Sequence, residues 1–293
     1  MELPATERVG TPDGTVLAVH RIPGEGSPIV FLHGFTGDSS AMLDLARHSC
    51  DGRPALLVDL IGHGGSDAPE NVEPYRMSSV VDQVLSIVGN EPPGTVHLVG
   101  YSMGGRVAVS MAARAPWYFR SLTILSSTAG LTEPDLRAAR AVHDGELADR
   151  IEQIGVESFV DEWLATPLFV HLAESLADEV YDAMRSQRLR SSAIGLANSL
   201  RGTGTGSMPP VWVSIGQLRC PVITLAGSLD ERHVALARRL AELAQDGRSG
   251  TIEGVGHSLP LENPEESGAV IAAFLKGCEF KTTNLDSNPS EPS

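Results

Sequence analysis

The pentapeptide Gly100–Gly104 restricts the fold of this chain more than any other feature. It follows an apolar run, Val96–Val99, and precedes a helix-forming run, Val107–Ala113. This order predicts a strand, a sharp turn and a helix, with Ser102 at the apex of the turn. Glycines beside the serine permit the strained turn and let the helix pack closely on the strand. A serine held there can lose its proton to a histidine from elsewhere in the chain.

Short apolar runs alternate with helical patterns on both sides of this turn. Nearly continuous apolar runs are typical of parallel strands that are covered on both faces. The predicted strands are Val16–Ile22, Ile29–Leu32, Leu56–Asp59, Val96–Gly100, Leu122–Leu125, Val222–Ala226 and, more weakly, Thr251–Glu253. The predicted helices are Met42–Arg47, Met77–Val88, Gly104–Ala115 and His233–Ala244. The alternation predicts an α/β fold with a mostly parallel central sheet flanked by helices.

The stretch from Thr128 to Arg219 interrupts the alternation, because its apolar residues recur at helical spacing and it has no convincing strand. A helical insertion before the late strands predicts a lid over the carboxyl edge of the sheet, where open α/β sheets bind ligands. Residues 201–210, rich in glycine and proline, read as the loop that returns to the core. We therefore expect a core of residues 1–128 and 219–280, a lid of residues 129–218, and a polar, disordered tail of residues 281–293.

The charge balance excludes several classes of partner. The chain has 22 Lys and Arg against 37 Asp and Glu, which gives a net charge of −15, so we expect no binding to nucleic acid or to anionic membranes. Its 3 cysteines have no metal-ligand spacing and suit a reducing compartment. No secretory signal begins the chain, and no apolar run could span a bilayer. We expect a cytoplasmic monomer or weak homo-oligomer with no metal and no cofactor.

Two further residues complete a Ser–His–Asp constellation. Asp230 follows the predicted strand Val222–Ala226, and His257 follows the last strand, so both lie at the edge of the sheet that holds Ser102. The chain order Ser, Asp, His is the order of this architecture. Asp230 could instead cap the helix that follows, Glu231 is a rival carboxylate, and His257 could be an ordinary loop histidine.

An oxyanion site needs two backbone N–H groups aimed at one point. We expect them from Met103, directly after the serine, and from Phe35, in the loop after the Ile29–Leu32 strand. Arg106 lies one turn after Ser102 on the same helical face, in a largely apolar helix. A guanidinium there is costly unless an anion meets it, so it either forms an internal ion pair or binds a substrate carboxylate.

The predicted lid contains sequence motifs that are more specific to one family than the triad motifs are. They are Gly130–Glu133, Arg137–Arg140, Phe159–Trp163 and Gly195–Gly206. Together with Gly100–Arg106, these motifs are similar to those of the 2-succinyl-6-hydroxy-2,4-cyclohexadiene-1-carboxylate (SHCHC) synthases of menaquinone biosynthesis, which have the α/β-hydrolase fold. The resemblance covers roughly residues 28 to 276.

The resemblance implies a lyase that eliminates pyruvate from 2-succinyl-5-enolpyruvyl-6-hydroxy-3-cyclohexene-1-carboxylate, a substrate with three carboxylates. It implies that Ser102, His257 and Asp230 act as a base relay without an acyl-enzyme. The substrate-binding residues that it implies are Arg106, Arg140, Arg188, Tyr101 and Trp163.

Several of these assignments have alternatives. Arg140 could pair with Asp144 on a solvated helix, Arg190 competes with Arg188, and Trp163 could simply belong to the core of the lid. An esterase or a carbon–carbon bond hydrolase with the same triad is the alternative activity. A non-catalytic binding protein fits less well, because the serine and the histidine are both present.

Overall fold

The computed structural model describes residues 3–283, and these residues form an eight-stranded sheet with the strand order β1-β2-β4-β3-β5-β6-β7-β8. The strands are β1 (Thr6–Gly10), β2 (Val16–Ile22), β3 (Ile29–Leu32), β4 (Ala55–Val58), β5 (Val96–Tyr101), β6 (Phe119–Leu125), β7 (Val222–Gly227) and β8 (Gly247–Ile252). Strand β2 is antiparallel to both β1 and β4, and all other neighbours are parallel. This arrangement and the flanking helices confirm the predicted α/β class.

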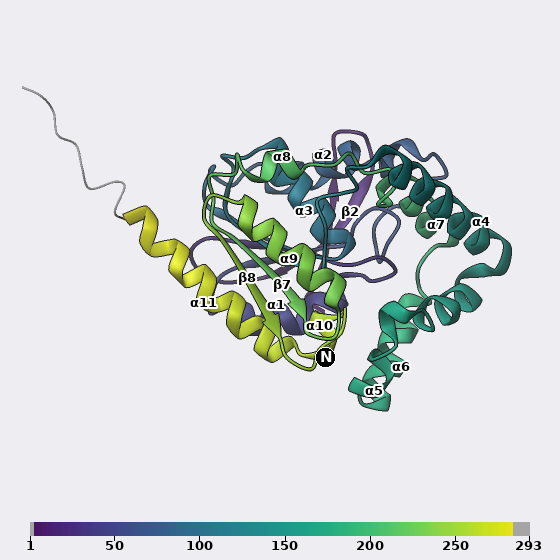
Figure 1. Ribbon diagram of the computed structural model, residues 1–293. Coiled ribbons are helices and arrows are strands. Elements are labelled where there is room, and N and C mark those ends of the chain that lie inside the picture. The colour runs from purple at the N-terminus through teal and green to yellow at the C-terminus, as the bar shows by residue number, and fades with distance from the viewer. Residues whose placement is uncertain (1–2, 284–293) are drawn as a thin grey trace, which may run out of the picture.

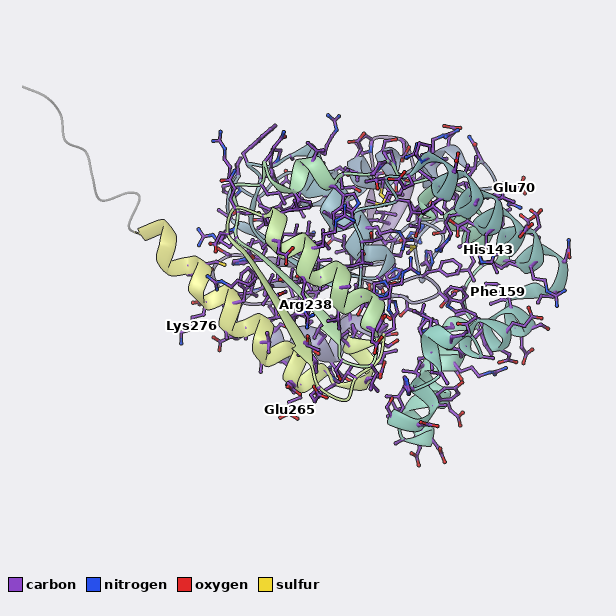
Figure 2. The ribbon with its side chains drawn as sticks, viewed as in Figure 1. Glu70, His143, Phe159, Arg238, Glu265 and Lys276 are labelled. Atoms are coloured by element: carbon purple, nitrogen blue, oxygen red, sulfur yellow. The ribbon has the colours of Figure 1, made fainter. Side chains whose placement is uncertain are left out.

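Helices cover both faces of the sheet (Figure 1). The core-forming helices are α1 (Leu43–Ser49), α2 (Met77–Val88), α3 (Met103–Arg114), α8 (Trp212–Ile215), α9 (Glu231–Leu243), α10 (Leu259–Glu262) and α11 (Pro264–Thr283), with short turns η1 (Ser39–Met42) and η2 (Glu73–Tyr75). Apolar side chains of α2, α3 and α8 pack on one face of the sheet, and those of α1 and α11 on the other. Outward positions are charged, as Arg238 on α9 and Glu265 and Lys276 on α11 show in Figure 2.

The segment between β6 and β7 is helical, as the sequence predicts. It contains α4 (Pro134–Leu164), η3 (Pro167–Phe169), α5 (Leu172–Ser175), α6 (Asp178–Arg188) and α7 (Ala193–Thr203) before α8. Helix α4 bends at Gly155, whose φ of 77° favours glycine. Two apolar clusters hold this segment together: one joins α4 to α7 and the other joins α4 to η3, α5 and α6. This helical segment therefore has apolar packing of its own, in addition to the apolar clusters on the two faces of the sheet.

The structure corrects four details of the sequence prediction. Strand β1 was not predicted, since its side chains are mostly exposed and it is held by backbone pairing with β2. Strand β8 begins earlier than predicted, at Gly247, and α7 extends to Thr203, so the return loop is shorter. Helix α11 was also missed, and it includes residues 281–283 of the predicted tail. The rest of that tail lies outside the described residues.

Candidate active site

Ser102 stands at the sharp turn between β5 and α3, as the pentapeptide predicts. Its φ of 50° and ψ of −107° are unusual for a residue with a side chain, so the turn is strained. The turn is held in place because Ser102 N donates to Leu125 O at 2.9 Å. A Cβ on Gly104 would collide with the Leu32 carbonyl, which explains why glycine follows the serine so closely. These contacts hold the strained turn and place the hydroxyl of Ser102 at the carboxyl edge of the sheet.

A continuous chain of hydrogen bonds joins Ser102 to His257 and Asp230. His257 Nε2 lies 3.0 Å from Ser102 Oγ, and His257 Nδ1 lies 2.8 Å from Asp230 Oδ2. Glu231, the rival carboxylate, is exposed at the start of α9. Asp230 also caps that helix, because its Oδ1 accepts the N–H of His233 at 3.2 Å. The cap and the triad contact, which the sequence offered as alternatives, therefore coexist on the two oxygens of one carboxylate.

The electrostatic surroundings keep His257 neutral at neutral pH. Burial lowers the pKa of His257 to about 4, against the hydrogen bond with Asp230, which raises it. The nearby His233 and Arg106 contribute to this lowering. For Asp230, burial would raise the pKa, but hydrogen bonds from His233 and His257 hold it well below its usual range. A neutral imidazole next to an ionised carboxylate is the state that can accept a proton from serine.

The loop around His257 is held by Glu262 and Tyr101. Glu262 accepts two backbone N–H groups, that of Gly256 at 2.7 Å and that of Ser258 at 2.8 Å. The hydroxyl of Tyr101 lies 3.0 Å from Ser258 Oγ, and its ring centroid is 5.5 Å from that of His257. Burial raises the pKa of Tyr101, so it stays a neutral phenol. These contacts fix the imidazole ring from two sides.

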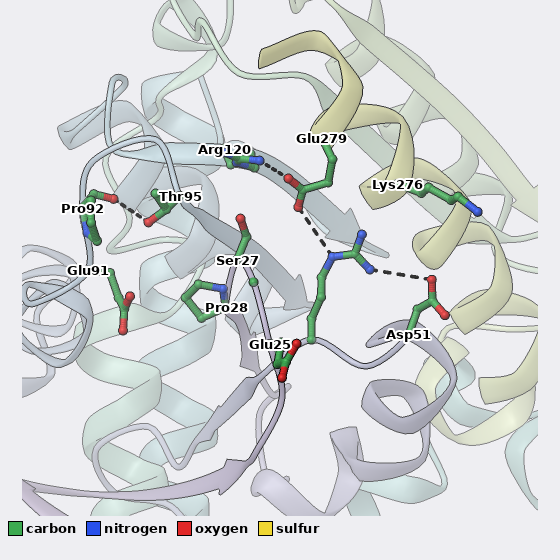
Figure 3. A pocket seen from close by; sticks show the side chains of 12 residues that line it. Glu25, Ser27, Pro28, Asp51, Glu91, Pro92, Thr95, Arg120, Lys276 and Glu279 are labelled. Atoms are coloured by element: carbon green, nitrogen blue, oxygen red, sulfur yellow. Dashed lines mark hydrogen bonds and ion pairs between the residues drawn. The ribbon is translucent and has the colours of Figure 1, made fainter. Parts of the chain in front are cut away.

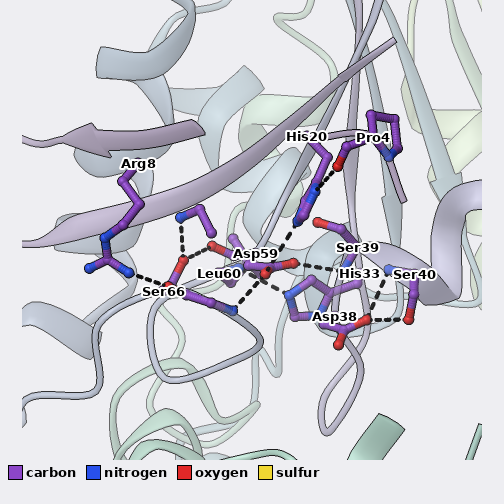
Figure 4. A network of polar contacts seen from close by, with 12 residues as sticks. Pro4, Arg8, His20, His33, Asp38, Ser39, Ser40, Asp59, Leu60 and Ser66 are labelled. Atoms are coloured by element: carbon purple, nitrogen blue, oxygen red, sulfur yellow. Dashed lines mark hydrogen bonds and ion pairs between the residues drawn. The ribbon is translucent and has the colours of Figure 1, made fainter. Parts of the chain in front are cut away.

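The loop that carries Phe35 is anchored by a polar network around Asp59 (Figure 4). Asp59 accepts the backbone N–H of Ser39 at 2.7 Å and that of Gly65 at 2.8 Å. The neighbouring His33, fully buried, accepts the N–H of Leu60 at 3.0 Å through Nε2. The N–H of Gly104 donates to the His33 carbonyl at 2.9 Å and so ties the loop to α3. The backbone of the loop is therefore rigid next to Ser102.

A small cavity lies over Ser102 and is walled by both the core and the lid. Its volume is about 20 Å³, and its lining includes Phe35, Tyr101, Ser102, Trp163, Phe169 and Arg188. The rings of Phe35 and Trp163 meet edge to face, with centroids 5.5 Å apart. The cavity has room for about one water molecule, so the helical segment leaves little open space over the serine.

Arg188 and Arg190 differ clearly in their positions. Arg188 is 3% exposed and lines the cavity, where it donates to Thr36 Oγ1 and, at 3.4 Å, to the Phe35 carbonyl. Burial lowers the pKa of Arg188. Arg190 points away and lies 3.4 Å from Asp38, with a side chain that is 63% exposed. Of the two, only Arg188 brings positive charge to the cavity.

Arg106 is half-buried and lies close enough to His257 for its charge to act on that imidazole, although it is not among the residues that line the cavity. Its Nη2 donates to the carbonyl of Thr203 at 3.2 Å, while its enclosed Nε has no hydrogen-bond partner. Burial and, to a smaller extent, the nearby charge of Arg140 lower the pKa of Arg106 to about 10. Within residues 3–283 no carboxylate forms an ion pair with Arg106, so the internal ion pair that the sequence left open is not found.

Arg140 does form the pair with Asp144 that the sequence offered as an alternative. Its Nε lies 2.7 Å from Asp144 Oδ1, but Asp144 is buried rather than solvated. The other oxygen of Asp144 accepts the N–H of Gly206 at 3.1 Å. Arg140 is thus tied through Asp144 to the loop that follows α7, and its charge acts on Arg106.

Trp163 is both part of the lid core and part of the cavity wall. Its ring stacks on Phe159 at 6.1 Å and meets Phe169 at 5.7 Å. Its Nε1 is enclosed and has no hydrogen-bond partner. The two roles that the sequence suggested for Trp163 are therefore compatible.

A larger cavity, of about 690 Å³, lies at the opposite edge of the sheet (Figure 3). Its lining comes from segments that precede β3, β4 and β5, from Arg120 near the start of β6, and from Lys276 and Glu279 of α11, at the amino ends of parallel strands. Its main cations are already paired, because Arg53 and Arg120 both contact Glu279. Ligands of open α/β sheets bind at the carboxyl ends, so this cavity is not our candidate site.

Sequence reasoning missed His233 and Phe169. His233 Nδ1 lies 2.7 Å from Asp230 Oδ2, and the Asp–x–x–His spacing at the start of a helix could have revealed it, since such residues share a face. Phe169 packs 6.0 Å from His257 across the cavity, a contact that no local pattern encodes. Asp230, His233 and His257 are also the one group among residues 3–283 whose ligand atoms lie close enough for a metal, within 4.8 Å, although both imidazoles already use Nδ1 to bond Asp230.

None of the described helices is long and apolar enough to cross a membrane. Cys50, Cys220 and Cys278 are buried and form no disulfide in this part of the chain.

Comparison with known proteins gives a consistent family. A model of the alpha/beta hydrolase family matches residues 29–269. A Bacillus subtilis (strain 168) protein, provisionally named 2-succinyl-6-hydroxy-2,4-cyclohexadiene-1-carboxylate synthase, is 35% identical over 92% of this chain and 98% of its own. A Salmonella paratyphi C (strain RKS4594) protein with the same name, without the qualifier, is 29% identical over 89% of this chain and 99% of its own.

Solved structures agree with this grouping. The structure of MenH from S. aureus has a TM-score of 0.83 and 28% identity, covering 95% of this chain and 100% of that one. A thermophilic esterase from Thermogutta terrifontis, with a TM-score of 0.81 and 23% identity over 94% of this chain and 99% of its own, shares the fold. The chain therefore belongs to the α/β-hydrolase family and, within it, to the 2-succinyl-6-hydroxy-2,4-cyclohexadiene-1-carboxylate synthases.

Proposed function

We propose that this protein eliminates pyruvate from 2-succinyl-5-enolpyruvyl-6-hydroxy-3-cyclohexene-1-carboxylate to give SHCHC, with Ser102, His257 and Asp230 as a base relay. One observation carries the proposal. A serine–imidazole–carboxylate chain with links of 3.0 and 2.8 Å lies near two guanidinium groups, those of Arg106 and Arg188, and neither forms an ion pair with a carboxylate within residues 3–283. Relatives that carry the synthase name over nearly their whole length support the same activity.

The reaction begins with proton transfer along this chain. His257 Nε2 takes the proton of Ser102 while Asp230 stabilises the resulting imidazolium. The serine alkoxide then removes a carbon-bound proton from the ring system of the substrate. The electron pair moves toward the succinyl carbonyl, and the carbon–oxygen bond to the enolpyruvyl group breaks. The electron pair returns from the carbonyl to form a second double bond in the ring as enolpyruvate leaves. Enolpyruvate takes up a proton on its methylene carbon and becomes pyruvate.

Negative charge that develops on the succinyl carbonyl needs donors that are already in place. We assign the backbone N–H groups of Phe35 and Met103 to this role. Met103 is the first residue of α3, where a helix has N–H groups without intrahelical partners. The anchoring of the Phe35 loop to Asp59 and to α3 supports a donor that does not have to reorganise during the reaction.

The carboxylates of the substrate require positive charge inside an acidic protein. Arg188 and Arg106 are the primary candidates, because Arg188 lines the cavity, Arg106 acts on His257 through its charge, and neither has an ion-pair partner in the described chain. Arg140 supplies charge at longer range, since Asp144 already holds its guanidinium. Tyr101 and Trp163 complete the cavity wall, and the unpartnered Nε1 of Trp163 offers a donor to the substrate.

The decisive experiment incubates the purified protein with the enolpyruvyl precursor and measures pyruvate release. We expect S102A to lose more than about 1,000-fold in kcat, in line with loss of the central member of a triad. S86A is the matched control, because Ser86 Oγ bonds only to its own helix, at Gln83 O. An ordinary rate in S102A, or no pyruvate from the wild type, would overturn the proposal.

A second measurement separates a lyase from an esterase with the same triad. An esterase releases a burst of nitrophenol from an activated ester as the acyl-enzyme accumulates. With the enolpyruvyl precursor, a base relay forms no covalent adduct on Ser102, so intact-protein mass spectrometry during turnover should show only the unmodified chain. A stable acyl adduct on Ser102 from this substrate would favour the esterase.

A further inference from the structure

Asp230 holds two imidazoles on one oxygen. His233 Nδ1 lies 2.7 Å from Asp230 Oδ2, and His257 Nδ1 lies 2.8 Å from the same atom. The two rings are 4.7 Å apart between centroids and inclined at 54°. The side chains of Asp230 and His233 are only 11% and 13% exposed, so solvent screens this group weakly. A Ser–His–Asp relay needs only one imidazole on the carboxylate, so the second requires an explanation.

Helix capping does not explain the imidazole of His233. The cap is the bond from the backbone N–H of His233 to Asp230 Oδ1, at 3.2 Å, and any residue except proline would make it. The imidazole makes a separate bond to Oδ2. His233 is not among the residues that line the cavity over Ser102, so direct contact with a bound substrate does not explain it either.

We infer that His233 is a positioning residue of the triad: by sharing Asp230 Oδ2 with His257, it sets how strongly His257 can draw the proton from Ser102. Two physical effects act in the same direction. A second N–H donor takes up part of the negative charge of the carboxylate, which then stabilises the His257 imidazolium less. When His233 carries a proton, its positive charge also opposes a second positive charge on His257.

The arrangement also couples the two imidazoles electrostatically. Positive charge on one imidazole opposes positive charge on the other, because both rings lie on one carboxylate oxygen. This coupling favours the neutral form of His257, which is the form that acts as a base. The other groups around His257 are Arg106 of α3, Tyr101 of β5 and Glu262, which holds the loop on both sides of it. The sharing of Asp230 therefore keeps the base functional at a lower pH than a lone imidazole would allow.

Two variants separate the two effects. H233N keeps a neutral N–H donor at the δ position, where Nδ1 stands in histidine, but it cannot take up a proton. H233F keeps a ring of similar size and removes both the donor and the charge. H48N is the matched control, because His48 is an exposed histidine at the end of α1. Nuclear magnetic resonance of ¹⁵N-labelled imidazoles follows the titration of His257 in each protein without any substrate.

We expect the pKa of His257 to rise in the order wild type, H233N, H233F, with about one unit between the first and the last. H48N should titrate like the wild type. In kinetics, the acid limb of kcat/KM for pyruvate release should move to higher pH by the same shift, with KM at neutral pH within about twofold, since His233 does not line the cavity. Equal pKa values for His257 in the wild type, H233N and H233F would overturn the inference.

The inference depends on the base relay proposed above for its kinetic consequence, but the titration does not. If wild-type enzyme releases no pyruvate while the pKa of His257 still shifts in the expected order, the lyase assignment fails and the coupling of the two imidazoles stands. Thermal unfolding of H233F provides the necessary check on folding. H233N keeps the donor to Asp230, so its titration still tests the charge effect if H233F does not fold.

Discussion

Replacement of Arg106 by methionine should stabilise the free enzyme and disable it at the same time. Burial lowers the pKa of Arg106 from 12.5 to about 10. This shift corresponds to about 3 kcal/mol against the charged form in the folded state, and it is an upper value because the side chain keeps partial access to water. The bond to the Thr203 carbonyl, lost in the variant, offsets about 1 kcal/mol. We therefore expect R106M to gain about 1–2 kcal/mol in the free energy of unfolding.

The catalytic effect should have the opposite sign. A substrate carboxylate that loses a desolvated guanidinium partner costs about 2–5 kcal/mol, so kcat/KM should fall by a factor of about 30 or more, mostly through KM. Urea denaturation and the pyruvate assay measure the two quantities on the same preparation. R106K should recover only part of the loss, because an ammonium group cannot make the bidentate contact.

R140M is the matched control for the sign of the stability change. Arg140 is paired with a buried carboxylate, that of Asp144, so its removal leaves an uncompensated charge and should cost about 3 kcal/mol. Two arginines that are close enough to affect each other electrostatically should thus shift stability in opposite directions. A loss of more than 1 kcal/mol in R106M together with an unchanged kcat/KM would refute the reasoning.

Three further results are expected. Burial lowers the pKa values of His63, His97 and His257 to about 3, 4 and 4, below the ordinary value of 6.5. The unfolded chain thus binds more protons than the folded one below pH 6.5. As the pH falls from 6.5 to 4, the free energy of unfolding should decrease by up to about 4 kcal/mol per pH unit. Urea denaturation measures this quantity, and a free energy that does not change with pH would contradict the prediction. W163F keeps the aromatic packing but removes an N–H without a partner, so the midpoint temperature of thermal unfolding should change by less than about 2 °C. Because that N–H is proposed to donate to the substrate, KM should rise several-fold. An unchanged KM would exclude this role. R188M should raise KM at least as much as R106M does, because Arg188 lines the cavity directly, and a normal KM in steady-state kinetics would exclude it from substrate binding.

Many of the strands and helices could be predicted from the sequence, because the strands of a parallel sheet are apolar along their whole length. The bounds of β2, β3 and α2 agree with the sequence prediction at both ends. The exposed strand β1 offered no such signal, because its stability comes from backbone pairing with β2 rather than from buried side chains. Helix α11 was missed although Ile271, Phe274, Leu275 and Cys278 recur on one face, so that signal was present in the sequence.

The site was predictable where chain order alone implies proximity. Ser102, Asp230 and His257 follow strands of one parallel sheet, so their meeting at one edge could be expected. The choice between Arg188 and Arg190 could not be made in this way. Residues two apart on a helical path point in different directions, and only the place where α6 ends decides which one enters the cavity.

Enzymes with other activities have the same fold, so the chemistry of this chain must follow from the residues around its triad. The esterase from Thermogutta terrifontis shares the fold at 23% identity, which says nothing about the reaction. A guanidinium held without a carboxylate partner destabilises the free protein, and selection would remove it unless a bound anion returned that energy. Arg106 and Arg188 are two such groups near one base, within the described residues. An ordinary ester would leave both unneutralised, whereas a polycarboxylate would neutralise both while it presents an acidic carbon–hydrogen bond to Ser102.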